Sequence, residues 1–201
     1  MQQIKLTVFF KKLIQIIKFN KLVLKSQLRK KFLKIRKIKN FKNFKINPIK
    51  IFNLIKKIDL TKKSIGGYFP VNYEVDDLDI LKEFKKKKYQ ISLPVINKKF
   101  DMNFYEWSFN EPLVVNKYGI PEPSSKKLIY PEIILIPLIA FNKNLYRLGY
   151  GGGYYDRYIE KINKKKSVKI GLALSFQKNN NISVTKYDKK LDYIVTEKYI
   201  L

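Results

Sequence analysis

The chain has 201 residues, 45% of them hydrophobic, and a formal net charge of +27 at pH 7. This length and apolar content predict one globular domain with a sizeable core and argue against global disorder. The absence of cysteine and histidine excludes disulfide scaffolds, thiol catalysis, ordinary zinc sites and every catalytic triad with an imidazole base. Any metal must therefore be a hard cation held by carboxylate and phosphate oxygens, which points to Mg²⁺.

The strong positive charge by itself does not identify a partner, because nucleic acids, acidic membrane surfaces and nucleotides are all attracted to it. Lysine, asparagine, isoleucine and tyrosine are abundant along the whole chain, a pattern typical of compositional drift in an AT-rich genome. A basic nucleic-acid-binding protein therefore stays open as an alternative function. Against it, the cations are spread along the chain and no recognition motif with aromatic platforms is visible.

Residues 1–20 form a basic segment, MQQIKLTVFFKKLIQIIKFN, with short apolar runs between lysines. The runs are too short for a signal-peptide core or a membrane span, and the lack of arginine and serine argues against a transit peptide. The segment predicts a basic amphipathic helix with one apolar side: Leu6, Phe9, Phe10, Leu13 and Ile17. This helix could pack on the body, lie on a membrane surface or have no role. We expect a soluble, cytoplasmic protein without stable membrane association.

Residues 22–39 predict a second stretch of helix, in which apolar residues recur every three or four positions. The expected buried stripe is Leu24, Leu28, Phe32, Ile35 and Ile38. Three cations, Lys25, Arg29 and Arg36, fall on a neighbouring stripe. From the pattern alone they indicate a solvated basic face.

The rest of the chain alternates between expected strands and helices. Helices are expected at 49–58, 78–84 and 154–163, strands from 65 and at 89–96, 102–109, 133–141, 168–175 and 191–200, and a proline-rich loop at 118–125. Two of the strands are continuous apolar runs, which are typical of strands buried on both faces. The pattern predicts a single α/β domain, whose mostly parallel or mixed sheet is flanked by helices on both faces, with the basic N-terminal helix as an extension.

The loop RLGYGGGYYDRY, residues 147–158, follows the buried strand and precedes a helix. Consecutive glycines allow positive φ angles and turn several backbone N–H groups inward, and the following helix N-terminus attracts anions. Arg147 and Arg157 flank the loop and can bind phosphate, while Asp156 can hold a Mg²⁺ ion that bridges phosphates. Neither the P-loop nor the dinucleotide pattern fits, since Tyr154 and Tyr155 stand where those motifs need other residues. A phosphate-binding loop and a purely structural turn both remain possible.

Six segments together resemble the 5-formyltetrahydrofolate cyclo-ligases, also called methenyltetrahydrofolate synthetases. The longest is PEIILIPLIAFNKNLYRLGYGGGYYDRYI; the others are KSQLRK, YFPVNYEVD, LPV, YGIPEP and YDKKLDYIVTE. They occur in the family's order and at plausible separations, from about Lys25 to Glu197. The expected domain therefore spans residues 21–201, and residues 1–20 lie outside the resemblance.

The resemblance implies a role for each matching residue. It implies ATP contacts by Lys25, Ser26, Gln27, Leu28, Arg29, Arg147, Leu148, Gly149, Tyr150, Gly151, Gly152, Gly153, Tyr154 and Tyr155. It implies folate contacts by Phe69, Glu74, Tyr150, Gly151, Gly152, Gly153 and Tyr154, and Mg²⁺ contacts by Asp156 and Asp188. Arg147, Tyr155 and Asp156 are the expected catalytic residues. Tyr68 and Trp107 either line the pterin site or belong to the core.

The resemblance also implies the reaction: cyclisation of 5-formyltetrahydrofolate to 5,10-methenyltetrahydrofolate, with ATP as co-substrate, Mg²⁺ as cofactor, and ADP and phosphate as products. Phosphorylation of the formyl oxygen would precede attack by N10, and no histidine or cysteine is needed. The expected partners are ATP and a reduced folate, with or without a polyglutamate tail, and no nucleic acid is expected. The expected state is a monomer. One departure is Tyr187, which precedes Asp188 where the family usually has histidine; reduced activity would follow if that histidine does more than pack.

Overall fold

The computed structural model describes residues 2–39, 45–58, 60, 63–97 and 100–201. A seven-stranded sheet in the order β11-β10-β7-β1-β2-β3-β6 forms its centre. These strands are β1 (Ser64–Gly66), β2 (Gln90–Ile96), β3 (Met102–Glu106), β6 (Leu128–Ile129), β7 (Ile133–Pro137), β10 (Val168–Leu172) and β11 (Tyr193–Val195). The pairs among β11, β10, β7, β1 and β2 are parallel, while β3 and β6 join antiparallel. The predicted mostly parallel or mixed sheet is confirmed.

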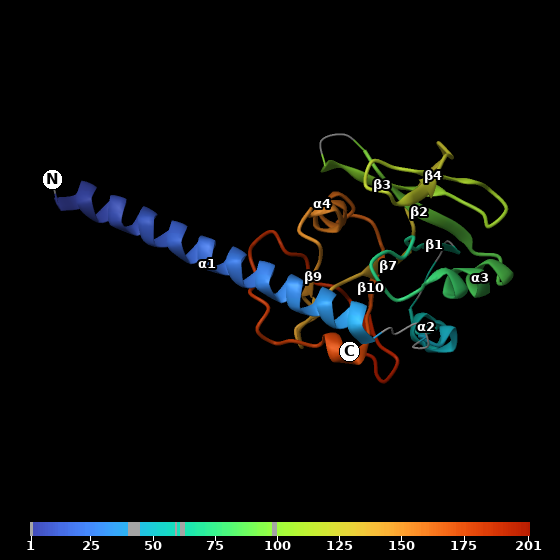
Figure 1. Cartoon of the computed structure of the whole chain (residues 1–201). Coiled ribbons are helices and arrows are strands. Elements are labelled where there is room, and N and C mark those ends of the chain that lie inside the picture. The colour runs from blue at the N-terminus through green and yellow to red at the C-terminus, as the bar shows by residue number, and fades with distance from the viewer. Residues whose placement is uncertain (1, 40–44, 59, 61–62, 98–99) are drawn as a thin grey trace.

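The strand β7 has its side chains buried alternately in two cores. Ile133 and Leu135 pack in one core with α2 (Pro48–Ile55) and α3 (Leu78–Lys86). Ile134 and Ile136 pack in the other core with α4 (Tyr154–Lys161). Side chains of successive strand residues point to opposite faces, so a strand covered on both faces must be apolar throughout. Figure 1 shows the helices on both faces, as predicted.

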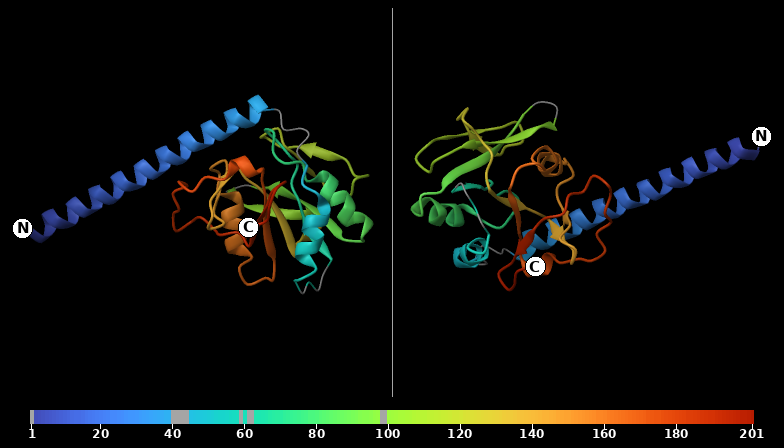
Figure 2. Two further views of the ribbon diagram at one scale, coloured as in Figure 1. Left: turned by 90° about the horizontal axis from the view of Figure 1, so that it is seen from below. Right: turned by 180° about the vertical axis from the view of Figure 1, so that it is seen from behind.

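The helix α1 (Gln2–Lys39) is a single helix of 38 residues. It joins the two helical stretches predicted over residues 1–20 and 22–39, because neither proline nor glycine interrupts residues 1–47. Its C-terminal half lies against the body, while its N-terminal half projects away from it (Figures 1 and 2). No helix in the described part of the chain is both long enough and apolar enough to cross a membrane.

The face of α1 that packs on the body differs from the predicted apolar stripe. Leu28 and Phe32 are buried as expected, in a small core with β8 (Ala140–Phe141) and β9 (Arg147–Leu148). However, Leu24 and Ile38 are 39% and 69% exposed. Lys25 and Arg36 are buried in their place. The prediction of a solvated basic face was wrong for these two cations, because their charged ends find partners in the body.

Smaller differences concern strand lengths. The apolar run 133–141 is divided into β7 and β8, and β8 turns away to pair with β9. The proline-rich segment 118–125 contains a short strand, β5 (Pro121–Pro123), which pairs with β4 (Leu113–Val115). A 3-10 helix (Ser175–Gln177) follows β10. The second helix begins at Pro48, where the Asn47 side chain accepts a hydrogen bond from the Ile49 N–H, and ends at Ile55, before the predicted Ile58.

Candidate active site

The glycine loop lies between β9 and α4, as the sequence predicted. Gly151 and Gly153 have φ angles of 104° and 68°, values that side-chain-bearing residues rarely adopt. Gly153 is the N-cap of α4. A Cβ atom at Gly153 would lie 2.7 Å from Nη1 of Arg157, the far end of a flexible side chain, so it is the positive φ angle that requires glycine here. Glycine therefore shapes the backbone at the N-terminus of α4, where the helix dipole attracts an anion.

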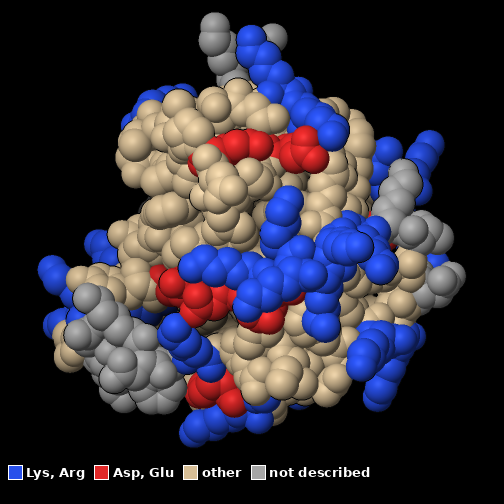
Figure 3. Space-filling model, turned by 90° about the vertical axis from the view of Figure 1, so that its right-hand side faces the viewer, with Lys and Arg blue, Asp and Glu red and all other residues tan. Residues whose placement is uncertain are grey.

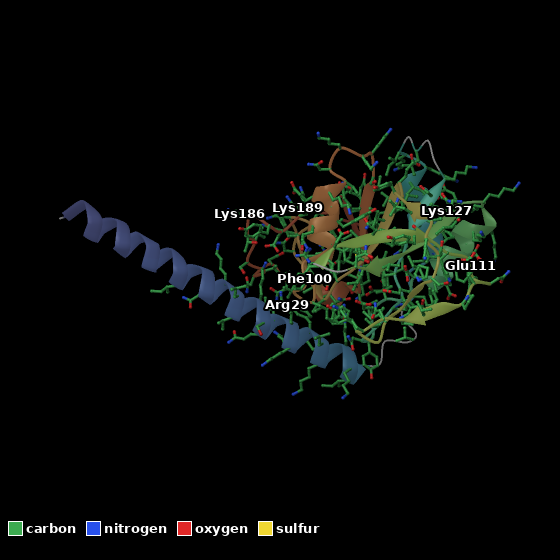
Figure 4. All side chains as sticks on the ribbon, turned by 90° about the horizontal axis from the view of Figure 1, so that it is seen from above. Arg29, Phe100, Glu111, Lys127, Lys186 and Lys189 are labelled. Carbon is green, nitrogen blue, oxygen red and sulfur yellow. The ribbon has the colours of Figure 1, made fainter. Side chains whose placement is uncertain are left out.

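Helix α1 brings Arg29 onto this loop. The Arg29 Nε donates a hydrogen bond of 2.8 Å to the carbonyl oxygen of Gly149. Its guanidinium carbon lies 3.3 Å from the position of a Cβ on Gly151. Figure 4 shows Arg29 on the part of α1 that crosses the body. An arginine from the first helix and the glycine loop thus form one surface, although 120 residues separate the two hydrogen-bonded groups.

Lys25 and Asp188, predicted to bind ATP and Mg²⁺ respectively, form an ion pair. The Lys25 Nζ lies 2.7 Å from Oδ2 of Asp188, and the side chains are only 8% and 20% exposed. Asp188 also accepts hydrogen bonds from the backbone N–H and the hydroxyl of Thr185, at 2.6 and 2.8 Å. Burial alone would raise the pKa of Asp188, but the hydrogen bonds from Lys25 and Thr185 lower it below its ordinary value. Asp188 is therefore an anion that anchors α1 beside the loop.

Arg147 and Asp156 form a second ion pair across the glycine loop. The Arg147 Nη2 lies 3.0 Å from Oδ1 of Asp156. Both side chains also bind the backbone of Lys189: its N–H donates to Asp156 at 3.0 Å, and its carbonyl accepts from Arg147 at 3.2 Å. These bonds hold together the start of α4, the strand pair β8–β9 and residues 185–189. The geometry places three of the cations predicted for ATP, Lys25, Arg29 and Arg147, around one loop.

Arg157 is turned toward a different part of the molecule. Its Nη2 donates to the Gly152 carbonyl at 2.6 Å, and its Nε donates to the Phe100 carbonyl at 2.9 Å. The guanidinium lies 5.4 Å from the ring centre of Tyr154, whose hydroxyl is 2.9 Å from that of Tyr118. Arg157 thus closes the outer side of the loop and does not face Arg147 across it.

A polar cluster around the buried Arg36 borders the other side of the loop. The Glu74 carboxylate accepts a hydrogen bond of 2.9 Å from the Val71 N–H, and burial raises its pKa to about 7. Burial also raises the pKa of the Tyr150 hydroxyl to about 12. The Arg36 guanidinium donates to this hydroxyl at 3.4 Å and to the Leu138 carbonyl. Two residues predicted to bind folate therefore lie near a buried arginine of α1: the Tyr150 hydroxyl accepts a hydrogen bond from Arg36, and the charge of Arg36 partly opposes the rise in the pKa of Glu74 that burial causes.

Tyr155 lies between the cationic side of the loop and this polar cluster. Burial raises the pKa of its hydroxyl well above the ordinary value, Glu74 and Asp77 raise it further, and Arg147 opposes them. The hydroxyl oxygen is buried and has no hydrogen-bond partner within the described residues. An unpaired buried hydroxyl is costly, so its position suits a group whose partner arrives with a ligand.

The remaining predicted residues fall into three groups. Ser26 and Gln27 are exposed on α1. Leu28 and Leu148 are buried and pack in the same small hydrophobic core beneath the glycine loop. Phe69 is partly exposed between β1 and α3. Tyr68 and Trp107 are buried and bonded to the Val75 and Glu111 carbonyls, which favours the core reading for both. Tyr187 is 72% exposed.

Sequence reasoning missed four residues of this region: Arg36, Tyr118, Thr185 and Lys189. Arg36 was assigned to a solvated basic face with Lys25 and Arg29, although it lies two turns after Arg29 on the same helix. Tyr118 and Lys189 lie within two of the segments that carry the family resemblance, YGIPEP and YDKKLDYIVTE, but no role was assigned to either residue. Nothing in the local pattern indicates Thr185.

Asp156 and Asp188 do not form a complete metal cage on their own. The described residues contain no group of three or more His, Cys, Asp or Glu side chains that could hold a metal ion. Their oxygen donors nevertheless suit Mg²⁺, which is usually held by one or two carboxylates together with substrate phosphates and water. The donor set therefore fits an ion that arrives with ATP.

Fold and site together define an α/β protein whose glycine loop, at the N-terminus of α4, contacts an arginine of the first helix. The 5-formyltetrahydrofolate cyclo-ligase family matches residues 21–197, and the chain belongs to this family. The family resemblance expected from the sequence, and the enzyme class that it implied, are confirmed.

The chain is similar to relatives of known name. It is 35% identical to the 5-formyltetrahydrofolate cyclo-ligase of Mycoplasma genitalium over 136 residues, which cover 67% of this chain and 73% of the relative. The Haemophilus influenzae cyclo-ligase is 29% identical over 136 residues, covering 64% of this chain and 73% of the relative.

Two solved structures have the same fold. The 5,10-methenyltetrahydrofolate synthetase of Mycoplasma pneumoniae superposes with a TM-score of 0.64 at 28% identity, covering 86% of this chain and 98% of that one. The synthetase of Aquifex aeolicus gives a TM-score of 0.67 at 30% identity, with 88% and 91% covered.

Proposed function

We propose that this protein converts 5-formyltetrahydrofolate to 5,10-methenyltetrahydrofolate in an ATP- and Mg²⁺-dependent reaction that releases ADP and phosphate. The observation that carries the proposal is the convergence on one glycine loop of α1 cations on one side and the Glu74–Tyr150 cluster on the other. Such a loop can hold the phosphates of ATP and the formyl end of a folate against each other. Family membership supports the same activity.

The reaction begins with attack of the formyl oxygen on the γ-phosphorus of ATP, which releases ADP. The nitrogen N10 then attacks the activated formyl carbon, loses its proton and closes the ring, and phosphate departs with the former formyl oxygen. No protein nucleophile is required, so the work of the protein is alignment and charge neutralisation. When bound with ATP, Mg²⁺ would neutralise phosphate charge, and Asp156 and Asp188 are the residues that would hold it.

Different residues of the chain contribute to alignment and to charge neutralisation. Arg29, Lys25 and Arg147, with the N-terminus of α4, stabilise the charge on the phosphoryl oxygens. The half-buried Glu74, with a pKa of about 7, can accept or share a proton with the pterin ring near neutral pH. Tyr155, between the two groups, has a hydroxyl that is free to donate to a ligand oxygen. The catalytic roles proposed for Arg147, Tyr155 and Asp156 follow from these positions.

The charges on the face that carries α3 do not have the pattern of a nucleic-acid-binding surface. On the face that carries α3, cations and carboxylates lie side by side (Figure 3), as in the pairs Lys45–Asp79 and Lys86–Glu83, both at 2.6 Å. Nucleic-acid-binding faces usually present a continuous basic stripe. We further propose that the enzyme acts as a cytoplasmic monomer on folates that can carry a polyglutamate tail.

The direct test is the absorbance of methenyl product formed from 5-formyltetrahydrofolate, with ATP and Mg²⁺ each omitted in turn. Product should form only when both are present. Arg29→Ala should lower kcat/KM for ATP about 10- to 100-fold, the effect of losing one charge-assisted hydrogen bond. Lys30→Ala, at the exposed neighbouring position on α1, is the matched control and should behave as wild type. Equal conversion without nucleotide, or none under any condition, would contradict the proposal.

A further inference from the structure

The N-terminal half of α1 has no place in the catalytic site. The family match begins at residue 21, and every residue placed at the site lies at or beyond Lys25. The helix nevertheless continues without interruption from Gln2 to Lys39, a length of about 57 Å at 1.5 Å per residue. Its N-terminal half projects from the body in all three ribbon views (Figures 1 and 2). A projecting helix of this length needs another partner or a water-compatible surface.

The surface of this half is not fully water-compatible. Apolar residues recur every three or four positions at Leu6, Phe9, Phe10, Leu13 and Ile17. Among the side chains that the structure describes, Ile16, Leu22, Val23 and Leu24 are exposed, with 56%, 61%, 38% and 39% of their surface accessible. Residues 22 to 24 point to different sides of the helix, so the apolar side of this segment is defined by the sequence positions 6 to 17.

The charge of the same half has one sign only. Lysine occupies positions 5, 11, 12, 18 and 21, and no acidic residue precedes Asp59. Lys5 and Lys12, like Lys11 and Lys18, are seven residues apart, so each pair lies on one side of the helix, two turns apart. The helix therefore combines an apolar series with a purely cationic one.

This combination favours one kind of partner. A second copy of the chain would bring two sets of like-charged lysines together, and a nucleic acid would pair with the lysines but leave the apolar residues in water. An anionic lipid surface accepts both, because headgroups pair with lysine while apolar side chains enter the boundary of the acyl region. We propose that residues 2–24 bind reversibly, in the plane of the interface, to membranes that contain anionic lipid. The proposal does not depend on the catalytic activity.

The test is co-sedimentation of the full-length protein with vesicles of phosphatidylcholine alone or with about 30% phosphatidylserine, an anionic lipid at a level that gives a negative surface potential. Binding is expected only to the anionic vesicles, and it should weaken as salt rises from about 0.1 to 1 M. Lys11→Gln/Lys12→Gln should weaken binding about fivefold per lysine, or about 30-fold in total. The matched control, Lys126→Gln/Lys164→Gln, removes the same charge at exposed positions of the body and should leave binding unchanged.

A second measurement reports whether apolar residues enter the lipid. The tryptophan of Phe10→Trp should shift its emission to the blue on anionic vesicles, after subtraction of the Trp107 signal from the wild-type protein. Three results would overturn the proposal. The first is that the two double variants bind anionic vesicles equally well, and the second is that the protein binds without a blue shift of the tryptophan emission. The third is that the protein forms a concentration-dependent dimer or an RNA complex but does not bind vesicles. A urea unfolding midpoint equal to that of wild type verifies that the Lys11→Gln/Lys12→Gln variant is folded.

Discussion

The environment of the Glu74 carboxyl group disfavours its charged form. The size of this effect predicts how the stability of the protein depends on pH. Burial raises its pKa from 4.5 to about 7, more than the Val71 hydrogen bond and nearby Arg36 can offset. The Glu74→Gln substitution keeps the size and the acceptor for the Val71 N–H but cannot ionise. We therefore expect this variant to be more stable than wild type at alkaline pH.

The magnitude follows from the linkage between protonation and folding. Below pH 4.5 the folded and unfolded chains both hold the Glu74 proton, so its effect on the free energy of unfolding is zero. Between pH 4.5 and about 7 only the folded chain keeps the proton, and wild type loses stability relative to Glu74→Gln. The interval is roughly 2.5 pH units at about 1.4 kcal/mol each, so the difference should level off at about 3.5 kcal/mol above pH 7.

Urea unfolding of both proteins between pH 4.5 and 8.5, fitted to a two-state transition, measures this difference. The variant and wild type should be equally stable near pH 4.5 and should diverge as the pH rises. The same exchange at Glu111, an exposed position (Figure 4), controls for the loss of one negative charge from a basic protein. A difference for Glu74→Gln that does not change with pH, or that has the opposite sign, would refute the account of this buried carboxyl.

Three further predictions concern the ion pairs and the extension. Lys25→Met should lower the free energy of unfolding by about 2–3 kcal/mol, because Asp188 is left partly buried without its cation; a urea midpoint equal to wild type would contradict this. Asp156→Asn should reduce turnover roughly 100-fold, as expected for a preorganised electrostatic group, and should also lower the urea midpoint, because the buried Arg147 loses its carboxylate partner; near-normal turnover at limiting Mg²⁺ would make Asp156 a structural residue. A chain that starts at Asn20 should keep its turnover per folded molecule, and a severalfold loss would place the extension at the active site.

The sheet and its helices were predictable because their signals are local. Ile133 to Ile136 form a continuous apolar run, and such a run fits only a strand covered on both faces. Asn47 and Pro48 mark the start of α2, and the glycines at 151 and 153 have the positive φ angles that a tight loop before a helix requires. These features depend on a few neighbouring residues.

The details of the site were less predictable because they depend on contacts between distant segments. Lys25 and Asp188 are 163 residues apart in sequence, so no local pattern shows that they pair. The burial of Arg36 depends on the Leu138 carbonyl and the Tyr150 hydroxyl, which only the folded chain brings to it. The spacing of apolar residues predicted that Leu24 and Ile38 are buried, because this pattern takes no account of how charged residues can be paired. The body instead receives the side of α1 whose cations can be paired.

The most direct test of the proposed reaction is the fate of the formyl oxygen. We expect that 5-formyltetrahydrofolate labelled with ¹⁸O in the formyl group, incubated with the protein, ATP and Mg²⁺, will transfer its label to inorganic phosphate. Mass spectrometry should find one labelled oxygen in the phosphate for each methenyl product formed, because the oxygen attacks phosphorus and leaves with it. Phosphate without the label, formed together with methenyl product, would show that ATP is hydrolysed by water and would contradict phosphorylation of the formyl oxygen.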